Sequence, residues 1–185
     1  MERKEALELL KKEIKNQNLI KHSLAVEAAM KDLAEKFDQD KEKWGICGLL
    51  HDIDYEKTKN APDLHSKTGS DFLKNLGLEE EICQAILTHN QIHGLEPKSK
   101  MAKALFCLDP LTGLIVAATL VLPSKKIKEL KTENIINRFG EKSFAKGANR
   151  EIIGKCQDYL NLKLEEFVEI CLFSMQKIAY QLDLE

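Results

Sequence analysis

The residues of this sequence best suited to chemistry are its five histidines and the aspartates near them. An apolar run, residues 48–50, ends in His51 and Asp52, two adjacent side chains that can both bind a metal. Imidazole nitrogens and carboxylate oxygens together suit iron, manganese, zinc, cobalt or nickel, and they disfavour soft thiolate chemistry. The pattern indicates a centre for a divalent transition metal. The remaining histidines are His22, His65, His89 and His93.

Each histidine also has an ordinary structural explanation. His22, His51 and His89 align with apolar residues at helical spacing, so each is expected to face the core. A lone histidine in such a place is more often a hydrogen-bonded core residue than a ligand. His65 stands near the start of a predicted helix, where a surface position would explain it equally well. No histidine taken alone therefore predicts a metal site.

The aspartates carry more information. Asp52 lies at the C-terminal end of a predicted helix, where the helix dipole disfavours an anion by roughly 0.3–1 kcal/mol. A bound cation would reverse this cost, because a carboxylate is then the best available group. Asp109 precedes Pro110, and this pair is the expected N-cap and first residue of a helix. Adjacent side chains on a helix point about 100° apart. His51 and Asp52 can therefore bind one metal only if it lies between the directions in which the two side chains point.

The elements that must position these residues are helices, and the fold class predicted is all-α. No segment reads as a strand, so we expect a compact bundle of short helices. The polar segment 54–62 is predicted to be a loop. Asn18 and either Asp38 or Asp40 are expected to cap helices, and Pro110 to separate two. The predicted helices span 2–16, 18–37, 41–52, 63–76, 79–91, 99–108, 110–122, a short piece after Ser124, 133–139, 149–160 and 164–182.

Composition restricts the class of protein. The chain has 185 residues, of which 43% are apolar, enough for one domain with a core. The formal net charge of −2 gives no general reason to expect nucleic-acid or membrane binding. The longest apolar run, residues 111–122, is shorter than the about 20 residues that span a bilayer, and the charged N-terminus lacks a signal-peptide pattern. A cytoplasmic protein is expected. The five cysteines form no C-x-x-C pair and are expected to be reduced core residues.

The order of the candidate ligands resembles the H…HD…D signature of the HD superfamily of metal-dependent phosphohydrolases. His22, the His51-Asp52 pair and Asp109 occupy its positions. The resemblance extends to the family's two-metal branch, which adds histidines in H-x-x-x-G and near Ile-x-x-His-His. The corresponding stretches here are residues 65–69, which read HSKTG, and residues 86–90, which read ILTHN. The match covers close to half of the chain.

This resemblance implies two metal positions joined by a bridging carboxylate from Asp52. Two departures from the pattern stand out. Asn90 occupies a place where the two-metal branch often has another histidine, so the second metal would be weakly held or His93 would supply the missing ligand. Asp54 replaces the glycine of the common H-D-I-G form. The implied ligands are His22, His51, Asp52 and Asp109 for the first metal, and His65, His89 and Asp52 for the second.

The implied activity is hydrolysis of a small phosphate ester or nucleotide by a metal-activated water, with His51 and Asp52 as the central catalytic pair. With a single metal, an acidic side chain would have to help deprotonate the water, and Asp54 is the candidate. Two other classes stay open. One is an HD-type di-iron oxygenase, and the other is a non-catalytic module in which the metal stabilises a binding or sensing domain.

A phosphorylated substrate also requires cations and hydrogen-bond donors. Lys146 and Arg150 belong to a basic, glycine-containing segment, residues 138–150. This segment either covers the site or forms a solvated connection between helices. With Asn90 and His93, these two residues are the candidate substrate contacts. No glycine-rich loop of the G-x-x-x-x-G-K-[ST] type is present, which excludes a motor driven by nucleoside triphosphates.

The expected organisation is a single HD-type domain over residues 1–185. The metal-binding core would span about 18–122, and a C-terminal helical extension about 123–185. The sequence leaves the substrate, the identity and number of the metals, and the oligomeric state open.

Overall fold

A computed structural model describes all 185 residues and contains helices but no strand, as predicted for an all-α protein. Eleven α-helices and three short 3-10 helices follow one another along the chain. They are α1 (Arg3–Glu13), α2 (Gln17–Lys36), α3 (Lys41–Leu50), α4 (Tyr55–Thr58), α5 (Lys67–Asn75), α6 (Glu80–His89), η1 (Gln91–His93), α7 (Lys100–Leu120), η2 (Ile127–Glu129), α8 (Thr132–Gly140), α9 (Arg150–Gly154), α10 (Cys156–Leu160), α11 (Leu164–Lys177) and η3 (Ala179–Leu182).

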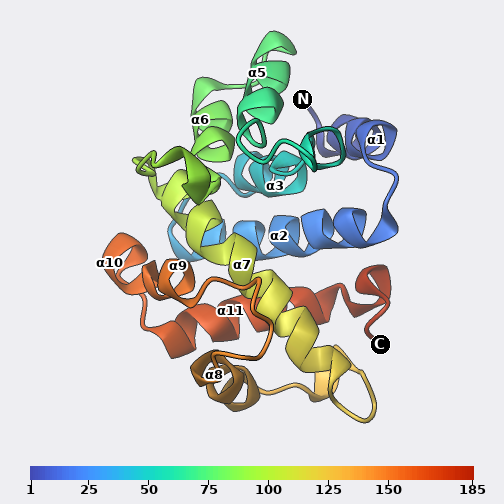
Figure 1. The fold of residues 1–185 in the computed structure, drawn as a ribbon, viewed down its shortest axis with the longest axis vertical. Helices are drawn as coiled ribbons and strands as arrows, with labels where there is room; N and C mark the ends of the chain where they lie inside the picture. The colour runs from blue at the N-terminus through green and yellow to red at the C-terminus, as the bar shows by residue number, and fades with distance from the viewer.

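Helix α7 is the central element of the bundle. It runs diagonally through the molecule and crosses α2 and α11, as Figure 1 shows. Helices α1, α3, α5 and α6 lie on one side of α2, and the C-terminal helices α8 to α11 lie on the other. Because α7 contacts both α6 and the C-terminal helices, one apolar core extends through the whole chain.

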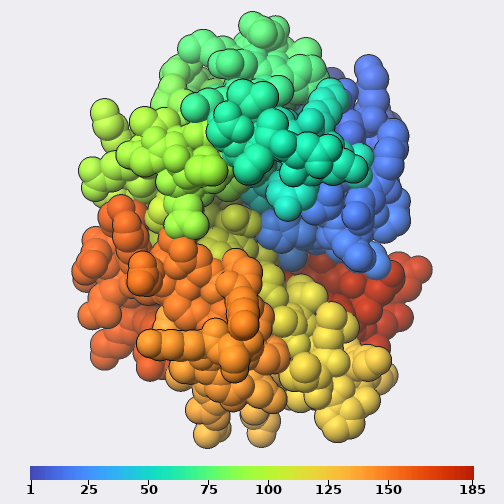
Figure 2. Space-filling view, in the orientation of Figure 1, coloured from blue at the N-terminus to red at the C-terminus, as the bar shows by residue number.

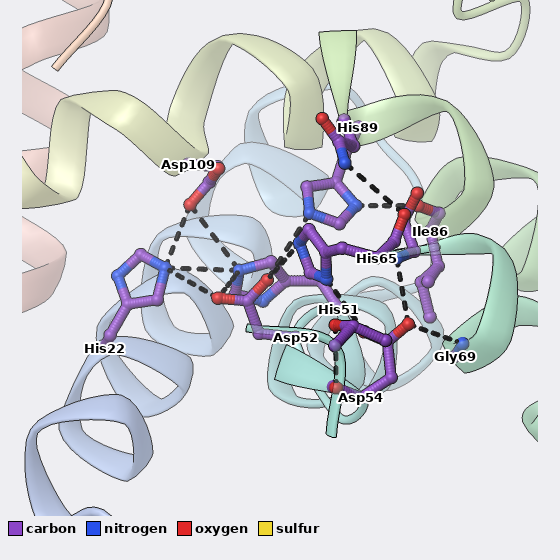
Figure 3. A network of polar contacts seen from close by, with 12 residues as sticks. His22, His51, Asp52, Asp54, His65, Gly69, Ile86, His89 and Asp109 are labelled. Atoms are coloured by element: carbon purple, nitrogen blue, oxygen red, sulfur yellow. Dashed lines mark hydrogen bonds and ion pairs between the residues drawn. The ribbon is translucent and has the colours of Figure 1, made fainter. Parts of the chain in front are cut away.

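The predicted break at Pro110 is wrong, because α7 continues from Lys100 to Leu120 with this proline in its interior. An interior proline removes a backbone donor and costs about 3 kcal/mol in an isolated helix. Packing outweighs that cost here, since Leu108 and Leu111 on either side are completely buried. Asp109 is consequently not a helix cap. It lies in the middle of α7, and its carboxylate is directed at a histidine of α2 (Figure 3).

Several predicted boundaries also shift. Asn16, not Asn18, caps α2, and its side chain accepts a hydrogen bond from the Asn18 N–H. Of the two candidates Asp38 and Asp40, it is Asp40 that caps α3. The segment 54–62 contains the short helix α4, and α5 begins at Lys67 rather than near residue 63. Ser66 has a φ of 70°, a left-handed value that interrupts a right-handed helix. The stretch 149–160 divides into α9 and α10.

The five cysteines are free thiols in the core, as predicted. Burial in apolar surroundings raises the pKa of the Cys107 thiol to about 12 and disfavours thiolates at these positions. By length and composition α7 alone would suffice to cross a membrane, but 67% of its most apolar stretch is buried inside the protein. This is the pattern of a central core helix.

The close approach of α3 to α2 depends on a glycine. A Cβ added at Gly48 would lie 2.9 Å from the Val26 carbonyl oxygen and 3.0 Å from the Glu27 nitrogen. We expect Gly48→Ala to lower the free energy of unfolding by about 1–3 kcal/mol, because the two helix backbones must separate. Urea denaturation measures this difference.

Gly154→Ala in α9 is the matched control, since no atom outside the local helix lies within 4 Å of its added Cβ. We expect this variant to be neutral or more stable by up to about 1 kcal/mol, the helix-propensity gain of alanine over glycine. Equal stability of the two variants would contradict the close-packing explanation.

Candidate metal centre

The side chains of four histidines and two aspartates lie close together beside α7, as the close-up in Figure 3 shows. They come from widely separated parts of the chain. All six metal ligands predicted from the sequence are brought together: His22 from α2, His51 at the end of α3, Asp52 directly after it, His65 from the turn before α5, His89 from the end of α6, and Asp109 from α7.

The Asp52 carboxylate lies at the middle of this cluster and divides its two oxygens between two groups of histidines. Its Oδ2 lies 3.6 Å from Nε2 of His22 and 3.4 Å from Nε2 of His51. Its Oδ1 lies 3.2 Å from Nε2 of His65 and 3.4 Å from Nε2 of His89. Each oxygen of this carboxylate thus faces a different pair of imidazoles.

Two histidines at helix ends are oriented by the carbonyls of their own helices. Nδ1 of His51 donates to the Gly48 carbonyl oxygen at 2.8 Å, and Nδ1 of His89 donates to the Ile86 carbonyl oxygen at 2.6 Å. A carbonyl can only accept, so the proton must be on Nδ1 in both rings. Both Nε2 atoms therefore direct a lone pair into the cluster when the imidazoles are neutral.

Thr112 orients His22. Its hydroxyl donates to the Asp109 carbonyl oxygen at 2.9 Å, and its oxygen accepts from Nδ1 of His22 at 3.1 Å. Nε2 of His22 then faces Oδ1 of Asp109 at 2.9 Å. Thr112 was not among the residues singled out in the sequence. Its spacing of one helical turn from Asp109 is the signal that places both side chains on one face of α7.

Asp54 does not reach the cluster directly, and its proposed role as a base that deprotonates water is not supported. It is buried, and its Oδ1 accepts from Nδ1 of His65 at 2.9 Å. Its Oδ2 accepts from the backbone N–H groups of Ser66 and Gly69 at 2.9 and 2.8 Å. Asp54 thus holds the His65 ring and the start of α5, and the absent side chain at Gly69 makes room for it.

The distances within the cluster fit a metal. Ligand atoms about 2.0–2.2 Å from a zinc-like ion lie roughly 3.0–3.5 Å from one another, and the contacts between Nε2 and carboxylate oxygens span 2.9–3.6 Å. The two Nε2 atoms of His22 and His51 are 3.2 Å apart. With both Nδ1 atoms acting as donors, two lone pairs face each other at this distance, so a proton or a cation must lie between them. The donor set suits divalent transition metals.

The electrostatics of the metal-free cluster agree with a cation site. Burial lowers the pKa of His51, but the Asp52 and Asp109 carboxylates outweigh burial and hold that pKa well above its ordinary value. Burial also opposes charge on Asp52 and Asp109, yet the surrounding imidazoles hold both carboxyl pKa values well below the usual range. The site therefore stabilises positive charge at its centre.

Asn90 and His93 do not face the centre. Nε2 of His93 donates to the His65 carbonyl oxygen at 2.7 Å. The Asn90 amide donates to the same oxygen at 3.3 Å, while its Oδ1 accepts from the Ile92 N–H at 3.2 Å. Neither side chain therefore adds a ligand atom beside those of Asp52, His65 and His89.

A cavity of about 440 Å³ opens onto the centre. Leu19 and Tyr55 lie at its wall together with residues 145–148, so part of the predicted basic segment does cover the site. Figure 2 shows this orange part of the chain facing the green segments across a hollow. Lys146 is an exposed member of the lining. A smaller cavity of about 190 Å³ adjoins it and is lined by Asn90 among others.

Arg150 lines neither cavity. Its guanidinium donates to five backbone carbonyl oxygens at 2.6–3.4 Å, those of Arg138, Phe139, Phe144, Ala145 and Ala148. The geometry thus supports a role in ordering the covering segment and gives no support to the direct substrate contact predicted from the sequence.

Metal binding must displace protons from this centre. Burial lowers the pKa of His65, but hydrogen bonds to Asp52 and Asp54 raise it to about 9, so the metal-free ring is protonated at pH 7 and must lose a proton before Nε2 can bind a metal. We expect proton release on Zn²⁺ or Mn²⁺ binding at pH 7 that diminishes above about pH 9, and an affinity that rises with pH over this range. Calorimetry in buffers of different ionisation enthalpy measures the release, and tight binding with no release at pH 7 would refute this expectation.

Comparison with known proteins agrees with the centre. The family model named HD domain matches residues 19–141. "Ribonuclease Y" of Lawsonia intracellularis is 31% identical over 158 residues, which cover 80% of this chain and 30% of that protein. "Ribonuclease Y" of Oleidesulfovibrio alaskensis is 30% identical over 140 residues, covering 74% of this chain and 27% of its own length.

"Ribonuclease Y" of Thermotoga petrophila is 31% identical over 140 residues, with the same coverage of 74% and 27%. The chain therefore spans less than a third of the length of these curated relatives. No solved structure matches the chain. The family match spans all six residues of the centre, and on this evidence the chain belongs to the HD-domain family.

Proposed function

We propose that this protein is a metal-dependent phosphohydrolase that acts on a small phosphate ester or nucleotide through a metal-activated water. The observation that carries the proposal is the division of the Asp52 oxygens between two groups of imidazoles. Oδ2 faces His22 and His51, whereas Oδ1 faces His65 and His89. A single carboxylate placed in this way suits two metals that share it.

The six residues of the centre would hold one or two divalent ions, which would lower the pKa of a bound water and neutralise charge that develops on a phosphoryl group. The protein's own residues supply the geometry. His51 is completely buried, so its ring is fixed by packing as well as by the Gly48 carbonyl. The carboxylates of Asp52 and Asp109 offset the positive charge of the loaded centre. His65 and His89 both line the smaller cavity.

The cavity supports a small substrate. Its volume of about 440 Å³ lies in the range of small-molecule pockets. The Tyr55 ring packs edge-on against His65, with 5.2 Å between ring centroids, and is 42% exposed, so one face is free to stack on a nucleobase. Lys146 also lines this cavity and is a candidate contact for a phosphate.

A ribonucleotide phosphodiester is the second candidate, favoured by the relatives that carry the name "Ribonuclease Y". A panel of nucleoside monophosphates, dinucleotides and a short RNA, tested after metal analysis, separates the two candidates. Phosphate release from monophosphates supports the first, and cleavage of RNA alone supports the second. Two irons together with oxygen consumption would identify an oxygenase, and bound metal without turnover would identify a sensing module.

Asp52→Asn tests the bridging carboxylate while keeping the shape of the side chain. We expect kcat on the best panel substrate to fall by roughly a hundredfold or more, the loss typical of a group that stabilises the transition state, with a metal content below that of the wild type. Metal analysis and initial-rate assays measure both effects. Asp63→Asn, an exposed aspartate outside the centre, is the control. Full activity of the Asp52 variant would overturn the proposal.

Lys146→Ala tests the cationic wall of the cavity. We expect KM to rise roughly tenfold with little change in kcat, the loss of about one hydrogen bond to a charged group, and the difference to shrink at high salt. Lys142→Ala is the matched control, because Lys142 is exposed in the same segment and lines neither cavity. Equal KM values for the two variants would remove Lys146 from the binding site.

A further inference from the structure

His65 is held differently from the other histidines of the centre. His22 and His89 lie within helices and His51 caps one, whereas His65 comes from the turn that precedes α5. Its carbonyl oxygen accepts no backbone N–H. The position of this ligand therefore depends on side chains.

Two of these side chains come from the segment after α6. His93 of η1 donates through Nε2 to the His65 carbonyl oxygen at 2.7 Å, and the same N–H reaches the Ser66 hydroxyl oxygen at 3.0 Å. Asn90 adds a longer hydrogen bond to the His65 carbonyl at 3.3 Å. This segment directly follows His89. The residues that contact the carbonyl of His65 therefore lie next to a second candidate ligand, His89, in the sequence.

The backbone beside His65 is strained. Ser66 is fully buried and has a φ of 70° and a ψ of −34°, a region that costs a non-glycine residue about 1–3 kcal/mol and persists only where surroundings enforce it. Three contacts do so: its N–H donates to Asp54, its hydroxyl donates to the Leu87 carbonyl oxygen at 3.0 Å, and its oxygen accepts from His93. These hydrogen bonds hold the turn in its strained conformation.

We propose that His93, assisted by Asn90, is a positioning residue that sets the affinity of the second metal position, the one formed by His65, His89 and Oδ1 of Asp52. The inference rests on the two-metal form of the proposed function. His93 acts through the His65 carbonyl and the Ser66 turn, because its Nε2 is already committed to these two acceptors and the residue lines neither cavity. Groups that orient metal ligands typically contribute 10–100-fold to metal affinity.

Metal binding without substrate tests the proposal. We expect the wild-type protein to bind two Co²⁺ or Mn²⁺ ions per chain, measured by calorimetry and by elemental analysis after desalting. His93→Ala should keep the tight first ion and weaken the second about 10–100-fold. His93→Gln, whose amide retains a donor for the His65 carbonyl, should restore most of the affinity. Asn90→Ala should have a smaller effect, since its hydrogen bond is longer.

Ile92→Ala is the control on the same turn, because this side chain is 55% exposed and outside the contacts to His65. The Co²⁺ visible spectrum separates positioning from ligation: His93→Gln should leave its shape unchanged if His93 is not a ligand. A changed spectrum, unaltered binding of both ions by His93→Ala, or a wild type that binds one ion would each overturn the proposal. Since no turnover is measured, failure of the hydrolase proposal would be seen separately, in the substrate panel.

Discussion

The structure depends most on the placement of one buried carboxylate, Asp52, among four imidazoles. Such a group is costly to bury without partners, and here each oxygen faces two histidine nitrogens. The charges are complementary in the metal-free state, because the pKa values of His51 and His65 are raised and that of Asp52 is lowered, which keeps these three groups ionised. Replacing the protons by metal ions would keep this balance.

A second set of hydrogen bonds determines where the ligands point. The last carbonyls of a helix have no partner within it, and His51 and His89 each use one of them, three residues earlier in the chain. His22 relies on Thr112 of another helix, and His65 on Asp54. These outer contacts differ in kind: the helix-end histidines are oriented locally, whereas the other two require distant elements to pack correctly.

The centre and its cover belong to different parts of the chain. All six residues of the centre fall within the family match at 19–141, while residues 145–148 at the wall of the larger cavity follow it. Arg150 orders that cover through carbonyl oxygens rather than through a ligand. The six candidate ligands and this part of the cavity wall are therefore separated along the sequence by α8.

The sequence by itself determined the helical class, the core-facing histidines and the order of the six ligands, because helical periodicity and residue type are local properties. Tertiary packing decided the rest. Helix α7 continues through Pro110 since burial of its neighbours outweighs the lost hydrogen bond. Asp109, which the sequence offered both as a cap and as a ligand, therefore lies inside α7 and beside the centre. Asp54 and His93 have side chains that suit a metal or a substrate, yet the fold places them behind His65, whereas Asn90 both contacts the His65 carbonyl and lines the smaller cavity. Spacing along a chain cannot distinguish a residue that faces a cavity from one that supports its neighbour, because that difference depends on which distant elements meet there.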